Sequence, residues 1–208
     1  MEAHLRAGIA IYNAGGYHAA HDAWENHWLD LETGSDDERF LHGLIQFTAA
    51  VYHARDGNWS GATGLADSGR GYLGTVTASY RDVNIGDVRR YLAALETDPE
   101  RIERTDPLAL THRGEALIPS NLGFDATGVA AAVLAEENGY DAEPIERAAA
   151  YGSADLAAER TTSPFVTLLF DFVREPANRE IVYQRLSGHV DLRSQQEHDV
   201  KGLFDRRE

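Results

Sequence analysis

A helical period runs through residues 36–55, and it limits the fold more than any other feature of the chain. Apolar side chains cover most directions around this segment: Phe40, Leu41, Leu44, Ile45, Phe47, Val51 and Tyr52. On a helix with about 100° per residue, His42, Gln46 and His53 share one narrow arc. A helix that is apolar nearly all round is buried, so this polar stripe needs partners inside the protein.

A second polar stripe lies on the preceding segment, which we expect to be helical from Tyr17 to about Glu32. Four of its side chains fall within an arc of about 100°: His21, Trp24, Glu25 and Trp28. Two polar stripes on neighbouring buried helices satisfy each other most simply. The sequence therefore predicts a buried His/Glu/Gln/Trp site between these two helices.

Start and stop signals along the chain predict an all-α protein. We expect a helical bundle of about five helices within residues 1–97, followed by a helical C-terminal extension. Ser35-Asp-Asp-Glu38 has the pattern of a capping box at the start of a helix. Residues 110–117 fit a small hairpin between irregular segments. We place the domain division at 1–105 for the helical domain and 106–208 for the extension, whose function the sequence does not indicate.

A set of motifs resembles domain-of-unknown-function family 309, a small all-helical family of bacteria and archaea. The motifs are His21-x-x-x-Glu25-x-x-Trp28, Gly43-Leu-Ile-Gln46, Tyr52-His53, Gly57-Asn58 and Gly61-Ala62. The resemblance spans roughly residues 10–75 and departs at His42, where members often have glutamine. It implies an all-helical fold and points to the same polar residues, but the family has no established activity.

The chain is acidic, with 34 acidic residues against 19 basic ones and a formal net charge of −15. The excess is spread evenly, with 16 acids and 9 bases in residues 1–105 and 18 acids and 10 bases in the rest. Lys201 is the single lysine. A uniformly acidic, lysine-poor surface is typical of proteins from salt-accumulating cytoplasms, so we expect a haloarchaeal-type, halophilic family member.

Several functional classes are disfavoured by composition. The absence of cysteine removes disulfides, thiolate metal sites and thiol catalysis. The acidic balance disfavours nucleic acid as a partner. No signal-peptide core and no run of about twenty apolar residues occurs, so we expect a soluble, cytoplasmic protein without a membrane partner.

Three interpretations of the polar site stay open. In the first, Glu25, His21 and Gln46 form a buried structural network with the tryptophan indoles packed between the helices. In the second, an imidazole and a carboxylate one turn apart hold a metal. We expect no cofactor, but if a divalent ion such as zinc binds, its ligands are His21, Glu25 and His53. In the third, a metal-free pocket carries out acid–base chemistry.

Two functional hypotheses follow. In the first, the protein is a small-molecule hydrolase or related acid–base enzyme with Glu25 as base and His21 as its orienting partner. In the second, it is a non-catalytic module that binds a small molecule or a protein, and the polar site is structural. The residues that we assign to binding are Trp24, Trp28, His42, Gln46 and His53, and the enzyme hypothesis takes His53 or His42 as a further ligand. The sequence does not indicate the oligomeric state. His18 lies at the edge of the polar stripe, and we expect five further histidines at the surface: His4, His27, His112, His189 and His198.

Overall fold

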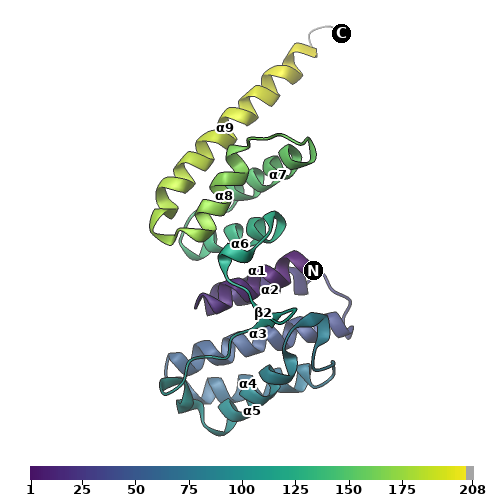
Figure 1. The fold of residues 1–208 in the computed structure, drawn as a ribbon, viewed down its shortest axis with the longest axis vertical. Coiled ribbons are helices and arrows are strands. Elements are labelled where there is room, and N and C mark those ends of the chain that lie inside the picture. The colour runs from purple at the N-terminus through teal and green to yellow at the C-terminus, as the bar shows by residue number, and fades with distance from the viewer. Residues whose placement is uncertain (205–208) are drawn as a thin grey trace. The chain divides into compact units, whose positions relative to one another are not determined.

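The computed structural model is all-α, as the sequence predicts, and it describes residues 1–204, with side chains described for residues 1–199. Contacts divide the chain into two compact units, Met1–Leu122 and a second unit that begins at Gly123 (Figure 1). The first unit contains the five predicted helices: α1 (Glu2–Asn13), α2 (Tyr17–Trp28), α3 (Asp36–Arg55), α4 (Trp59–Leu73) and α5 (Ile85–Thr97). Short 3-10 turns complete it: η1 (Tyr80–Asp82), η2 (Pro99–Glu103) and η3 (Pro119–Asn121).

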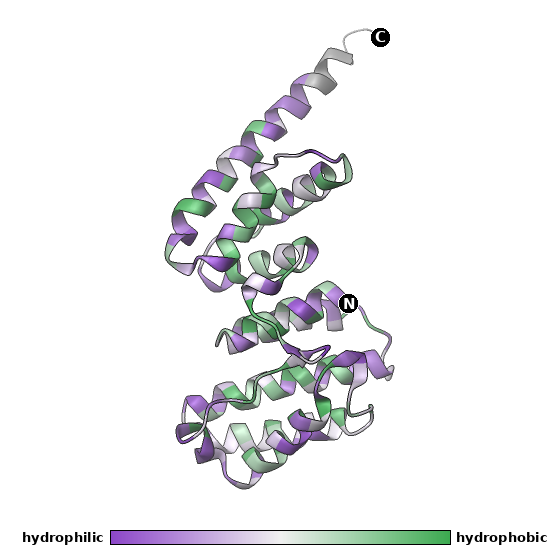
Figure 2. Cartoon of the chain, viewed as in Figure 1, coloured by the Kyte–Doolittle hydropathy of each residue, from purple (hydrophilic) through white to green (hydrophobic). Residues whose placement is uncertain are grey.

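The second unit is also helical, as we expected for the extension. Its elements are α6 (Phe124–Glu137), α7 (Glu143–Ala157), α8 (Pro164–Arg174), the short turn η4 (Pro176–Asn178) and α9 (Arg179–Phe204). Apolar and polar residues alternate along the helices of both units (Figure 2). Within the described residues, no helix is both long enough and apolar enough to cross a membrane.

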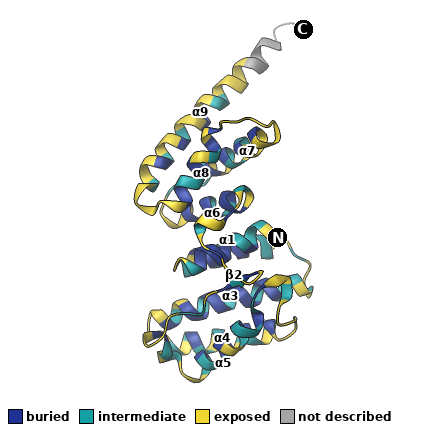
Figure 3. Cartoon of the chain, viewed as in Figure 1, coloured by how far each residue is buried: buried dark blue, intermediate teal, exposed yellow. Residues whose placement is uncertain are grey.

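Helix α3 forms the middle of the first unit, packed against α2 on one side and α4 on the other. Most of this helix is buried (Figure 3), and Phe40, Leu44 and Phe47 are fully buried, whereas Tyr52 is 46% exposed. The predicted cap is present, because the Ser35 hydroxyl accepts a hydrogen bond from the Glu38 amide at 3.2 Å. Its polar stripe is only partly enclosed and not fully buried as predicted, because His42, Gln46 and His53 all have intermediate exposure.

Helix α2 ends earlier than predicted, at Trp28 instead of about Glu32. The backbone tightens after it, since the Asp30 amide donates to the His27 carbonyl at 3.3 Å. Gly34 then adopts a φ of +82°, which favours glycine. The chain thus has room to reverse direction before α3 begins.

The predicted hairpin is confirmed, with β1 (Thr111–His112) antiparallel to β2 (Glu115–Ala116). The Asn13 side chain of α1 donates to the carbonyls of Leu110 and Leu117, both at 2.8 Å. Its amide oxygen accepts from the Leu110 amide at 2.9 Å. These bonds attach the hairpin to the first unit, so the division that we placed after residue 105 falls inside that unit.

Candidate functional site

Trp24 has a structural position on α2. Its side chain is fully buried, and its indole N–H donates to the Leu5 carbonyl of α1 at 3.4 Å. The ring lies so close to Gly8 that a Cβ at that position would come within 2.1 Å of the indole nitrogen. Trp24 therefore fastens α2 to α1 and is sealed from any ligand.

His21 and Glu25 lie on the partly exposed face of α2. Their side chains keep 30% and 44% of their exposure, and His21 Nδ1 is 3.8 Å from a Glu25 oxygen. Asp22 joins them, with 3.1 Å between His21 Nδ1 and its carboxylate. We call His21, Asp22 and Glu25 the α2 surface triad. The prediction of a buried site required Glu25 to be enclosed between Trp24 and Trp28. The structure instead leaves Glu25 partly exposed.

A second cluster is more enclosed, and it is centred on Glu38. The Trp28 indole donates to Glu38 Oε1 at 3.0 Å, and the Gly34 amide donates to the other oxygen at 3.3 Å. His42 Nδ1 lies 3.6 Å from the same carboxylate, with side-chain exposures of 19% for His42 and 14% for Glu38. The His42 ring stacks on Tyr72 of α4, with ring centres 3.9 Å apart, and meets Trp28 at 4.6 Å. We call Trp28, Glu38, His42 and Tyr72 the Glu38 cluster.

The other two predicted residues have separate surroundings. His53, near the end of α3, lies 2.9 Å from the Asn58 side chain through its Nδ1. Asn58 in turn caps α4 by accepting from the Gly61 amide at 3.0 Å. Gln46 is partly buried where α3 meets α4. The two helices are close there, because a Cβ added at Gly69 of α4 would lie 3.1 Å from the Cβ of Gln46.

The predicted single site is therefore two clusters with different carboxylates. Among the described residues, the ligand atoms of His21, Asp22 and Glu25 all lie within 4.8 Å of one another. Asp22, not His53, is the third member of this group, since His53 pairs with the helix cap instead. Helical spacing placed His21 and Glu25 together correctly, but it could not show that α2 turns this pair away from α3.

Three residues of the two clusters were not predicted as site residues: Asp22, Glu38 and Tyr72. We expected Glu38 to cap α3, but it accepts from the Gly34 amide, whereas the Ser35 amide donates to the Glu32 carbonyl. Its position one turn before His42 was a signal of a second His/Glu pair. Tyr72 carried no such signal, because its contact with His42 depends on how α4 packs on α3.

Three histidines expected at the surface are not fully solvated. His112 is buried beneath Arg6, whose guanidinium lies 3.2 Å from its Nδ1. Burial lowers the pKa of His112, and Arg6 lowers it further while Glu2 opposes the change. His4 stacks on His27 with ring centres 4.8 Å apart, and burial and this neighbour lower the pKa of His4. Burial also lowers the pKa of His27.

The first unit also contains a hollow of about 310 Å³ beside the start of α2. Tyr12, Tyr17 and Arg55 line one part of it, and residues 106–109 line the other. The Arg55 guanidinium lies over the Tyr17 ring at 5.5 Å from its centre. Tyr12 is fixed in the wall, because its hydroxyl donates to the Leu108 carbonyl at 2.9 Å.

Comparison with known proteins gives one family match. Residues 5–65 match the model of a family described as Domain of unknown function (DUF309). The matched segment begins within α1 and ends within α4, so it includes the α2 surface triad and three members of the Glu38 cluster. None of the curated proteins compared with the chain matches it. The chain thus contains a DUF309 domain over residues 5–65.

Proposed function

We propose that the first unit is a non-catalytic helical binding module in which the Glu38 cluster holds three helices in register. The carboxylate of Glu38 supports this role, because its two oxygens accept from an indole and from a backbone amide. A carboxylate whose hydrogen bonds are filled by the fold is costly to disturb. Glu25, by contrast, keeps 44% of its side-chain exposure on α2 and is much less enclosed than Glu38, which keeps 14%.

The hollow beside Tyr17 supports the binding part of this proposal. Its volume of about 310 Å³ is at the lower end of the range for small-molecule sites. The Tyr17 ring and the Arg55 guanidinium are both planar groups that stack favourably on a flat aromatic ligand. We therefore infer that the module binds a small aromatic compound here.

Phenol and indole are suitable probes, and their binding is measured by ligand-observed NMR. We expect saturable binding to the full chain that is lost in Tyr17→Ala. Tyr52→Ala is the matched control, because Tyr52 is exposed on α3 and does not line the hollow. Turnover of nitrophenyl esters that disappears in Glu25→Gln, with an unchanged melting temperature, would overturn the proposal in favour of a hydrolase.

A divalent metal at the α2 surface triad is a second candidate function. It is supported by the three ligand atoms within 4.8 Å, although all three come from one exposed stretch of helix. One histidine and two carboxylates suit zinc, with water completing the coordination. Stoichiometric zinc in protein purified without chelator, lost in His21→Ala, would establish this function. If the purified protein contains no zinc, ligand binding remains the proposed function of the first unit.

We also propose that the acidic surface adapts the protein to a salt-accumulating cytoplasm. Support comes from the net charge of −15, the even spread of the acidic residues and the single lysine. Simple screening of surface charge is nearly complete at a few tenths molar salt. The melting temperature is therefore expected to keep rising with potassium chloride well beyond that range. A melting temperature that is constant above about 0.2 M would refute the adaptation.

A further inference from the structure

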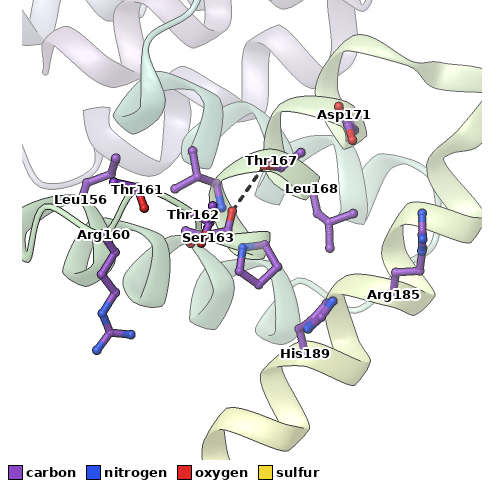
Figure 4. A pocket seen from close by; sticks show the side chains of 12 residues that line it. Leu156, Arg160, Thr161, Thr162, Ser163, Thr167, Leu168, Asp171, Arg185 and His189 are labelled. Carbon is purple, nitrogen blue, oxygen red and sulfur yellow. Dashed lines mark hydrogen bonds between the residues drawn. The ribbon is translucent and has the colours of Figure 1, made fainter.

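The second unit has a larger hollow that belongs to neither cluster of the first unit. It occupies about 620 Å³ between the connection from α7 to α8, the first turns of α8, and α9 (Figure 4). This volume is in the middle of the range for small-molecule sites. All the residues that line it belong to the second unit: Leu156, Arg160, Thr161, Thr162, Ser163, Pro164, Val166, Thr167, Leu168, Asp171, Arg185 and His189.

The lining reverses the charge sign of the chain. The lining contains two arginines, Arg160 and Arg185, and a single acidic residue, Asp171, in a protein whose net charge is −15. Arg185 is exposed on α9 and makes no hydrogen bond or ion pair with the side chains that the structure describes. His189 follows it by one helical turn, and both side chains border the hollow in Figure 4. The α9 side of the hollow thus offers unused N–H donors.

The opposite side carries hydroxyl groups. Thr161 and Thr162 are exposed in the connection before α8, and Thr167 is exposed one turn into that helix. The Thr167 hydroxyl donates to the Ser163 carbonyl at 3.3 Å, which is the dashed line in Figure 4. The Thr167 proton is therefore used within the helix, whereas the Thr161 and Thr162 hydroxyls make no hydrogen bond with the described residues and can donate to an oxyanion that the arginine neutralises.

A buried carboxylate fixes two of the polar side chains that line the hollow, Arg160 and Ser163. Asp155 of α7 is only 2% exposed and accepts from Arg160 at 2.9 Å and from Arg193 at 2.8 Å. Its other oxygen accepts from the Ser163 hydroxyl at 2.8 Å. Burial alone would raise the pKa of Asp155, but the hydrogen bonds from Arg193 and Ser163 keep this pKa below its ordinary value. Arg160 and Ser163 are therefore positioned before any ligand arrives, which lowers the entropic cost of binding.

Apolar side chains form the rest of the wall. Leu168 is buried beneath the hollow, whereas Leu156 is exposed at its edge. Pro164 and Val166 lie between the hydroxyl groups. A wholly inorganic ion would leave this surface uncovered.

We propose that this hollow binds a small organic anion, in which a phosphate or carboxylate group is joined to an apolar body. Arg185 pairs with the anionic group, His189 and the hydroxyls of Thr161 and Thr162 donate hydrogen bonds to it, and the leucines cover the apolar part. The proposal is independent of the function assigned to the first unit, because no residue is shared.

The test uses isothermal titration of the full chain with phenyl phosphate, benzoate and benzyl alcohol at constant ionic strength. We expect saturable binding of at least one of the two anions and none of the neutral alcohol. Preference for phenyl phosphate identifies a phosphate site, and preference for benzoate a carboxylate site. Because a charge-assisted hydrogen bond contributes about 1.5–3 kcal/mol, Arg185→Gln should weaken binding at least about tenfold.

Arg90→Gln is the matched control, since Arg90 is an exposed arginine of the first unit and its loss changes the net charge equally. We expect Arg90→Gln to bind the anions like the unaltered chain. Arg185 makes no hydrogen bond or ion pair with the described side chains, so a folding defect is not expected and the melting temperature checks this. Failure of both anions to bind, equal binding of benzyl alcohol, or equal losses in the two variants would each overturn the proposal.

Discussion

Two carboxylate–histidine pairs lie on neighbouring helices of the first unit, and they have opposite environments. His21 and Glu25 are one turn apart on α2, and Glu38 and His42 are one turn apart on α3. The α2 pair is partly exposed and adds only Asp22, whereas the α3 pair is largely enclosed between Trp28 and Tyr72. The same residue types at the same spacing thus give a surface group in one case and a structural cluster in the other.

The difference teaches that spacing assigns a pair to a helix face but not to an environment. Trp24 buries one face of α2 against α1. Glu25 is the next residue, about 100° further round the helix, and its side chain is partly exposed to solvent. On α3, the capping turn brings Glu38 under Trp28, so the carboxylate accepts an indole hydrogen bond. Four predictions break or sharpen this comparison.

Trp24→Ala should have the largest effect, because it removes the fully buried ring that fixes the orientation of α2. Replacement of a buried tryptophan by alanine costs about 3–5 kcal/mol. The free energy of unfolding is measured by urea denaturation followed by circular dichroism. A loss below about 1 kcal/mol would mean that α2 is not anchored by this side chain, and the exposure of Glu25 would then need another cause.

Glu38→Ala should cause the next largest loss in the free energy of unfolding. It leaves the Trp28 indole and the Gly34 amide without their acceptor, at a cost of about 1–2 kcal/mol. Glu25→Ala is the matched control on α2 and should change stability by less than about 0.5 kcal/mol. Equal losses in the two variants would remove the distinction between an enclosed and an exposed pair.

Acid should destabilise the protein through its less exposed histidines. The folded state lowers the pKa of His4, His27 and His112 below 6.5, so it favours their neutral forms. The stability that these neutral histidines contribute is complete above pH 6.5. It is lost as the pH falls from 6.5 through their lowered pKa values. Asp37, whose pKa Arg81 lowers from 3.8, affects stability only in more acidic solution.

Urea denaturation at several pH values between 7 and 4.5 measures this loss. The triple variant with glutamine at positions 4, 27 and 112 should have a flatter pH dependence. His189→Gln is the control, because His189 is exposed. The mechanism would be wrong if the triple variant and the control had the same slope as the unaltered chain.

The smallest expected effect is the coupling between His21 and Glu25. Exposed pairs one turn apart contribute about 0.3–0.5 kcal/mol, and a double-mutant cycle with His21→Ala and Glu25→Ala measures this value. The same cycle on Glu38 and His42 should give a larger coupling, because that pair is less exposed. A larger coupling on α2 than on α3 would reverse our assignment of the structural role.

The sequence alone was sufficient for the elements. Period and capping signals placed the helices, the Ser35 cap and the hairpin close to their observed positions, since these depend on neighbours within a few residues. The same local spacing identified His21 with Glu25 as a pair. It also singled out Trp28 and His42, which do meet in the structure.

Tertiary structure decided which of these residues face each other. The stacking of His42 on Tyr72, the sealing of Trp24 over Gly8 and the burial of His112 all depend on contacts between distant segments. So does the hollow of the second unit, where Asp155 of α7 meets Arg193 of α9. A periodic pattern fixes only the direction of a side chain from its own helix axis, whereas its partners depend on the rotation and distance of the next helix.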